Sequence, residues 1–359
     1  MTARRDLDPQ LDLFVPILSD LELRDARDTM ERPFFSLSKS KRLTPIQYAS
    51  PDGTVFVNVR PHQDFGMATI WDADILIWAA SVLNTQKKQG RNDPDRTLKA
   101  HPYELLKAIG RPTGGDHMKA LMAAIDRLTS TVIKTNIRAP DGEDHATFTW
   151  LDSGAYRKRK KQKNEQPGQR AVVNITVSDW FYRTVLEDKA LLAIDPAYFS
   201  ITGGRERWLY RVVRKHAGGA GPNGVTMKFQ TLFEKSGAEG TYRRFKFELL
   251  KIIGRNALPG FDLSLEAGKA LEPYLRMVPK IIRHAQPAEA TPPKSPDASH
   301  FPHLTELTIS MVRRDFPGWD LYSLKAEFDS WLADTPAQPE NYQKAFYGFV
   351  RQRHSRVHA

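Results

Sequence analysis

The chain has 359 residues, more than one hydrophobic core usually holds, so two or three compact units are expected. Hydrophobic residues make up 40% of it and charged residues 26%, which fits folded, water-soluble units and excludes wholesale disorder. The absence of cysteine excludes disulfides, thiolate metal sites and a cysteine nucleophile. Neither an apolar run of membrane-spanning length nor a secretory leader is present, so we expect a cytoplasmic protein without membrane contact.

The formal net charge of +11 is concentrated in two stretches of the chain. Residues 91–170 hold 16 basic and 10 acidic side chains, and residues 196–283 hold 16 basic and 7 acidic ones. The other stretches are close to neutral, whereas a surface that merely keeps a protein soluble mixes both signs. Two separate basic modules therefore predict two surfaces for a polyanion such as DNA.

Residues 46–195 are predicted to form the first basic domain. Apolar residues at helical spacing predict helices over residues 72–86, 102–110 and 116–131. The last two are joined by a turn, and two β-prone stretches, 132–138 and 146–151, then flank an Asp-Gly turn and predict a hairpin. Helix, turn, helix and hairpin in this order are typical of a winged helix.

Residues 196–283 show the same order of elements without a repeat of the residues themselves. The elements predicted before the turn at 237–240 are a helix at 198–216, a strand at 225–229 and a helix at 230–236. Thr241 then caps a second long helix that runs to about Ile253, and a hairpin follows. The predicted fold class is therefore α+β with tandem winged-helix domains, and a chance likeness of two helical hairpins is the alternative.

The two ends of the chain differ from these domains. Residues 1–45 are expected to be a flexible N-terminal arm. Residues 284–300 contain four prolines and no apolar periodicity, which predicts a linker. Residues 301–359 are predicted as three short helices, a small C-terminal helical domain whose function the pattern does not indicate.

The second long helix carries the strongest candidates for DNA contact. A recognition helix enters the major groove, where Arg and Lys reach guanine O6 and N7. The outward arc of this helix holds Arg243, Arg244, Phe247 and Lys251, with Lys246 at its edge. The alternative is a solvated helix face, but a Gly-rich turn before the helix and the most basic stretch around it favour DNA contact.

Further candidate contacts lie on two other helices. Lys119 and Arg127 are the outward cations of the helix over residues 116–131. Arg211 and Arg214 lie on the helix that precedes the second motif, and such a helix commonly crosses the DNA backbone. Alternatively, one or two of the basic residues on that helix are paired with Glu206 or with another domain.

A basic tract at residues 157–163 contains six cations in seven residues. It lies between the strand predicted at 146–151 and a further strand predicted at 171–177. Such a density attracts phosphate and predicts a flexible arm, although phosphate contacts carry no base information. A loop that only increases solubility is the alternative. The cations of the tract are Arg157, Lys158, Arg159, Lys160, Lys161 and Lys163.

Enzymatic motifs do not emerge from the sequence. The glycine-rich residues 218–224 lack the Gly-Lys-Ser/Thr ending of a phosphate-binding loop. The acidic residues at 141–144 are ordinary for a hairpin turn, so metal is not expected there. A nicking initiator would need two metal-binding histidines one residue apart, and none of the ten histidines has that spacing. We expect a protein that is not an enzyme, with no catalytic residues and no cofactor.

Several segments together resemble the plasmid replication initiator protein A (RepA-type) family of proteobacteria. They extend over some 250 residues and include Arg32–Leu37, Leu43–Ile46, Val55–Arg60, Gly66–Asp74, Ala193–Pro196 and Arg207–Tyr210. The resemblance implies tandem winged helices that bind repeated origin sequences in double-stranded DNA, promote origin opening and recruit host replication proteins without catalysis. It also implies repression of the protein's own promoter by a homodimer.

A second resemblance is confined to the N-terminal segment. Its residues Gln10, Leu11, Asp12, Leu13 and Phe14 are similar to the pentapeptide by which bacterial replication proteins bind the sliding clamp. An extended segment can place Leu13 and Phe14 in an apolar pocket while Gln10 forms a hydrogen bond at its rim. The alternative is a strand packed on the protein's own core.

Two other functions are compatible with the same helices. A winged-helix transcriptional repressor would contact no replication protein and would prefer one inverted repeat, whereas an initiator would occupy several direct repeats. A DNA-nicking enzyme would form a covalent adduct with DNA.

Overall fold

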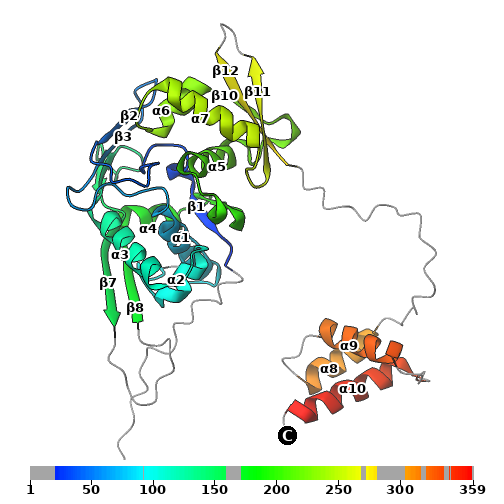
Figure 1. Ribbon diagram of the computed structural model, residues 1–359. Helices are drawn as coiled ribbons and strands as arrows, with labels where there is room; N and C mark the ends of the chain where they lie inside the picture. Colours follow the sequence, from blue (N-terminus) through cyan, green and yellow to red (C-terminus); the bar gives the residue numbers. More distant parts are fainter. Residues whose placement is uncertain are drawn as a thin grey trace, which may run out of the picture. The chain divides into compact units, whose positions relative to one another are not determined.

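The computed structural model describes residues 21–91, 93–158, 171–267, 272–280, 304–316, 321–334, 339 and 341–357 (Figure 1). The chain divides into two compact units, Met1–Ile282 and Arg283–Ala359. The division lies beside the expected linker at 284–300, which is outside the described residues. Helices and antiparallel sheets are mixed in the first unit, so the α+β class is confirmed.

Residues 21–45, which we call the strap, are packed into the first unit. Their strand β1 (Arg24–Ala26) pairs with β9 (Leu191–Ala193), and a 3-10 turn, η3 (Arg27–Thr29), follows. Met30 and Phe34 are 0% exposed. From residue 21 onward the expected flexible arm is therefore wrong, because apolar side chains of the strap join both large cores of the unit.

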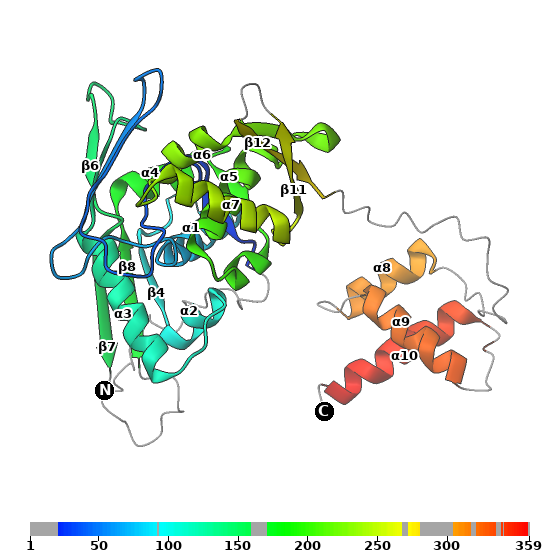
Figure 2. The ribbon, with the colours of Figure 1, turned by 45° about the horizontal axis from the view of Figure 1, so that its top comes forward.

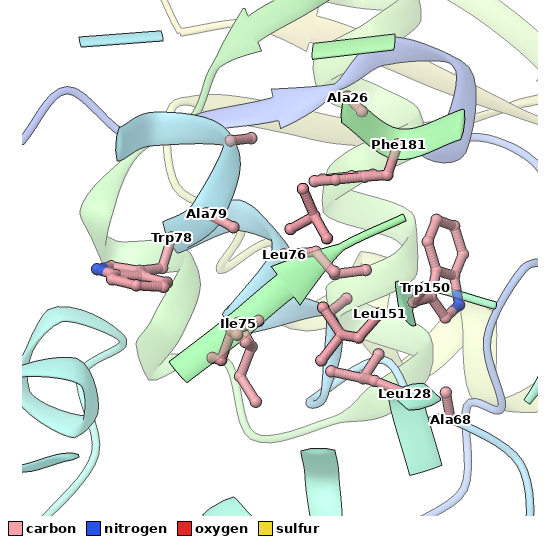
Figure 3. Packing of buried hydrophobic residues seen from close by; sticks show 14 of the residues in the cluster. Ala26, Ala68, Ile75, Leu76, Trp78, Ala79, Leu128, Trp150, Leu151 and Phe181 are labelled. Carbon is pink, nitrogen blue, oxygen red and sulfur yellow. The ribbon is translucent and has the colours of Figure 1, made fainter. Parts of the chain in front are cut away.

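The first part of the unit, residues 46–194, is called lobe 1. Its helical motif is formed by β4 (Thr97–Ala100), α2 (Pro102–Ala108), α3 (Gly115–Ser130), β7 (Leu151–Lys158) and β8 (Ala171–Val177). The three strands form an antiparallel sheet in the order β4-β8-β7. Helix α1 (Ala73–Lys88) is buried from Ala73 to Leu83 because most of those residues are apolar on every face. Leu76 of α1 lies between Phe181 and Leu151 in this core (Figure 3).

The hairpin predicted at 132–138 and 146–151 exists, but it does not belong to this helical motif. Its strands β5 (Val132–Thr135) and β6 (Ala146–Phe148) extend a second sheet with β2 (Ile46–Ala49) and β3 (Phe56–Arg60), in the order β2-β3-β5-β6. The expected wing was therefore wrong: β7 and β8 close the motif instead. Alternation of apolar residues identifies a strand but not its partner, and β5 finds its partner in β3, whose Val59 faces Ile133.

Helix α4 (Asp179–Leu186) completes lobe 1. The hydroxyl of Ser178 accepts a hydrogen bond from the backbone N–H of Phe181 at 3.4 Å and caps this helix.

The remainder of the unit, residues 195–280, is called lobe 2. The helix expected over 198–216 is divided into a 3-10 helix η4 (Pro196–Ser200) and α5 (Gly204–Ala217). A Cβ at Gly204 would lie 2.1 Å from the carbonyl oxygen of Leu37, so only glycine allows α5 to begin against the strap. The elements that follow are η5 (Gly221–Asn223), β10 (Val225–Lys228), α6 (Phe229–Ser236), α7 (Tyr242–Arg255), β11 (Phe261–Ala267) and β12 (Pro273–Pro279).

The two lobes share one topology. Strand, short helix, long helix and hairpin occur in this order in both, although β5 and β6 are inserted between α3 and the hairpin in lobe 1. The first strand pairs with the last: the orders are β4-β8-β7 and β10-β12-β11. Each long helix is preceded by one long core helix, α1 in lobe 1 and α5 in lobe 2. Figures 1 and 2 both show that the far ends of the β7–β8 and β11–β12 hairpins lie at opposite ends of the unit.

The second unit has its own small core. Its described helices are α8 (Glu306–Asp315), α9 (Leu321–Asp334) and α10 (Tyr342–Val357). Phe328 and Phe346 are 0% exposed and pack edge-on with ring centroids 5.5 Å apart.

Candidate nucleic-acid interface

Helix α7 presents a cationic face to solvent because its buried apolar residues lie on the other side. Thr241 accepts a hydrogen bond from the backbone N–H of Arg244, which confirms the predicted cap. Phe245, Leu249, Ile252 and Ile253 are buried at helical spacing. The opposite face exposes Arg243, Arg244, Phe247 and Lys251, with Lys246 half-buried at its edge, as the helical wheel predicted.

The charges of this face are only partly compensated. Glu248 accepts a hydrogen bond from Arg244 at 3.1 Å and one from Arg205. Neither Arg243 nor Lys246 forms an ion pair with another described residue. The Nζ of Lys251 lies 4.3 Å from the ring centroid of Phe247, which is 57% exposed. Donors and an accessible aromatic ring on one helix face suit a groove of DNA.

Helix α3 is a weaker candidate for DNA contact than α7. The side chain of Lys119 is 84% exposed, and it forms an ion pair of 3.4 Å with the equally exposed Asp116. Arg127 turns back instead and donates to both carboxylate oxygens of Asp72, at 2.7 and 2.8 Å. These hydrogen bonds raise the pKa of Arg127 and fix α3 against α1. The prediction of a DNA contact by Arg127 is not supported, because its guanidinium is engaged inside the lobe.

Helix α5 is a core helix and does not present its arginines to a ligand. Arg211 is 2% exposed and pairs with Asp25 of the strap, so the predicted DNA contact is wrong. Arg214 is half-buried, and its Nε donates to the carbonyl oxygen of Ala193 at 2.6 Å. Both arginines bind groups of the protein itself, because the strap and lobe 1 cover α5. The sequence of lobe 2 alone does not reveal this cover.

The basic tract follows the end of β7. Arg157 and Lys158 are the last residues of that strand, and Arg159, Lys160, Lys161 and Lys163 lie outside the described residues. Since β7 pairs with β8, the first two cations of the tract lie at the end of a strand of the helical motif. The clamp-like residues Gln10–Phe14 also lie outside the described part of the chain.

Neither a metal-binding cluster nor a membrane-spanning helix is found among the described residues. No three His, Asp or Glu side chains of that part of the chain gather as ligands for a metal ion. A groove of about 840 Å³ lies beside the turn at 139–145 and is lined by Trp180, Arg183 and several acidic residues. None of the described helices combines the length and apolar character that a membrane crossing requires.

The sequence reasoning missed the acidic partners that hold the basic helices. Asp25 and Arg211 are 186 residues apart in the chain, and Asp74 and Arg207 are 133 apart. Both carboxylates lie in segments whose composition is otherwise ordinary. Only the four arginines that α5 carries within 14 residues indicated that counter-charges were needed.

Comparison with known proteins relates most of the first unit to replication proteins. The sequence matches the family described as Replication initiator protein A over residues 24–263. It is 28% identical over 254 residues to a protein of Wigglesworthia glossinidia brevipalpis named "Putative replication protein", covering 69% of this chain and 87% of that protein.

Two solved structures of RctB domains 2 and 3 were also matched. The first has a TM-score of 0.49 and 15% identity, covering 69% of this chain and 96% of that one; the second has a TM-score of 0.44 and 15% identity, covering 68% and 94%. Since the family match spans well over half of the residues, this chain belongs to the Replication initiator protein A family.

Proposed function

We propose that this protein is a plasmid replication initiator that binds repeated origin DNA through two winged-helix domains, lobe 1 and lobe 2. Membership of the family supports the role in replication. The observation that carries DNA binding is the exposed face of α7, where Arg243, Arg244 and Lys251 surround Phe247. A helix that exposes cations after a tight turn is the element that reads the major groove in this kind of motif.

In this proposal each lobe contacts a different groove of the DNA. Helix α7 reads base edges, and α3, with its exposed Lys119, Ala120 and Ala123, approaches a second groove closely. The small alanine side chains allow the backbone of α3 to come near the DNA. The tract from Arg157 to Lys163 neutralises phosphates beyond the groove and contributes affinity without specificity.

The remaining roles follow from the family and the sequence. The initiator promotes opening of the origin and recruits host replication proteins, and residues 10–14 bind the sliding clamp. It acts by binding alone, without catalysis and without a cofactor. As a homodimer it represses its own promoter.

Footprinting of the protein on DNA that flanks its own gene tests this proposal. An initiator protects several direct repeats beside an AT-rich stretch. The double variant R243A/R244A is expected to lose about 1–3 kcal/mol of binding free energy for each base that it no longer reads, and to bind random DNA almost as well as before. R183A removes an exposed cation of α4 and serves as the control. Equal affinities of both variants for the repeats would contradict the assignment of α7.

The alternative function is a transcriptional repressor that uses the same helices. It predicts protection of one inverted repeat at the promoter and no protected direct repeats. The footprint therefore distinguishes the two functions, since both bind duplex DNA.

A further inference from the structure

The turn that leads into α7 rests on the strap. Gly237 has a φ of +57°, and a Cβ added to it would lie 2.5 Å from the Cβ of Pro33, closer than such atoms can approach. The Nη1 of Arg42 donates to the carbonyl oxygen of Gly237 at 2.7 Å, and Arg42 is only 7% exposed. Near the end of α6, just before the turn, Lys235 donates to Glu31 of the strap at 2.8 Å. The turn is therefore anchored by packing, by a hydrogen bond and by an ion pair.

The turn that leads into α3 rests, in return, on lobe 2. Gly110 has a φ of +65°, and a Cβ added to it would lie 3.0 Å from the Cβ of Phe199 in η4. Arg111, the next residue, donates to the carboxylate of Asp74 at 3.1 Å. The same carboxylate accepts two hydrogen bonds from Arg207 of α5, at 2.7 and 2.9 Å. Asp74 is 0% exposed and Arg207 4%, so this junction between the lobes excludes water.

Each turn before a long helix is thus anchored on a segment outside its own helical motif, and we call these contacts the reciprocal clamp. We propose that the reciprocal clamp fixes α3 and α7 in one mutual orientation, so that the protein recognises a two-part DNA site of a single spacing. This inference rests on the proposed function. The residues of the reciprocal clamp are Glu31, Pro33, Arg42, Asp74, Gly110, Arg111, Phe199, Arg207, Lys235 and Gly237.

A fixed orientation and a flexible one respond differently to the spacing of the site. Each added base pair moves one part of the site by about 3.4 Å along the DNA and by about 35° around it. Domains joined by a flexible linker would bind again when about 10 base pairs restore the rotational phase. Two helices held by buried contacts cannot follow, because the second part of the site then lies about 34 Å further along the DNA.

The first experiment measures binding to origin repeats in which 1, 5 or 10 base pairs are inserted at the centre of the footprint. We expect each insertion, including the longest, to weaken binding at least about 100-fold, because one helix can no longer reach its specific bases. Binding of the DNA with the longest insertion to within about threefold of the natural repeat would overturn the inference. Binding of all three inserted sites as tightly as the natural repeat would overturn it as well.

The second experiment needs no DNA. Because the chain has no cysteine, A123C on α3 and G254C on α7 allow spin labels at those two exposed positions alone. A single narrow distance distribution in the free protein is expected, and a broad one would overturn the inference. Binding to the origin is measured separately with the unlabelled wild type, because Ala123 lies on the face of α3 that is proposed to approach DNA. A narrow distribution together with failure of the wild type to bind its origin supports the reciprocal clamp while contradicting the proposed function, so the two failures are distinguishable.

Variants of the two turn glycines test whether the reciprocal clamp determines both the distance distribution and the spacing of the DNA site. G110A and G237A place a methyl group against Phe199 and Pro33, and we expect a broader distance distribution and a spacing penalty reduced to less than about tenfold. The controls G53A and G260A have similar φ values, +69° and +72°, with no atom within 4 Å of the added methyl group.

R42A serves as a milder variant, since it removes a hydrogen bond to the turn without adding an atom. If G237A and R42A keep the narrow distribution and the strict spacing of G260A, the reciprocal clamp is wrong.

Discussion

The guanidinium of Arg211 donates to both carboxylate oxygens of Asp25, at 2.6 and 3.0 Å, and also to the hydroxyl of Thr29 at 2.8 Å. Arg211 is 2% exposed and Asp25 4%. The pair joins α5 to the strap in the centre of the first unit. Removal of one partner would leave the other charge buried without compensation, which is far more costly than the loss of an exposed ion pair.

We therefore expect R211A to lower the free energy of unfolding by about 3–5 kcal/mol. Urea denaturation followed by circular dichroism measures this change. R183A is the matched control, because Arg183 and its partner Asp179 are 68% and 55% exposed and such pairs contribute less than about 1 kcal/mol. A stable R211A variant that binds DNA poorly would instead make Arg211 a DNA contact.

The stability of the protein should depend on Glu31 in the acidic range. Burial by itself would raise the pKa of Glu31, but hydrogen bonds from His216, Lys215 and Lys235 outweigh it and hold the pKa well below its ordinary value. The carboxylate therefore stabilises the folded state fully above the pKa of an unfolded glutamate, about 4.3. This contribution decreases as the pH falls below that value.

The variant E31Q tests this dependence. At pH 7 we expect it to be less stable than the wild type by about 3–5 kcal/mol, because the two half-buried lysines lose their counter-charge. The difference in free energy of unfolding should narrow as the pH falls below about 4.5, since the unfolded wild type then takes up a proton and E31Q does not. A difference that is constant from pH 7 to pH 3 would contradict this role for Glu31.

Neutralisation of the basic tract should reduce the salt dependence of DNA binding. Replacing the six cations of residues 157–163 by glutamine is expected to flatten the slope of log K against log[salt] by about 0.9 for each phosphate that the tract no longer neutralises. Affinity should decrease to a similar extent for origin and random DNA. A variant in which the four lysines become arginine keeps the charge and serves as the control; equal slopes for the two variants would exclude phosphate binding by the tract.

The clamp-like segment makes a separate prediction. L13A/F14A should abolish retention of the protein by an immobilised sliding clamp, because both side chains would fill its apolar pocket, while binding to the origin remains unchanged. I17A/L18A removes two apolar side chains from the same segment and is the control. Retention of L13A/F14A at the wild-type level would exclude this mode of clamp binding.

Local chemistry made several elements predictable. Ser178 and Thr241 precede helices as side-chain caps, and both accept the expected hydrogen bond. The exposed face of α7 also follows from the sequence, because the spacing of Phe245, Leu249 and Ile252 leaves only one side for the cations. These features depend on residues within one or two helical turns, which the sequence displays directly.

Partners distant in the chain were not predictable in the same way. Alternation identified β5 and β6 as strands, but their pairing with β3 depends on a sheet edge formed some 75 residues earlier in the chain. The strap, part of the arm that was expected to be flexible, is buried because its apolar side chains pack into cores that consist mostly of residues distant in the chain.

The sequence by itself determined where the helices and most of the strands lie, that two basic modules follow one another, and which face of α7 is cationic, because these depend on composition and local spacing. The tertiary structure alone decided which arginines remain accessible. Arg127, Arg211 and Arg243 all carry the same charge on a helix. The first two form ion pairs with Asp72 and Asp25, which lie in distant segments, because a charge that the fold removes from water is stable only beside an opposite charge.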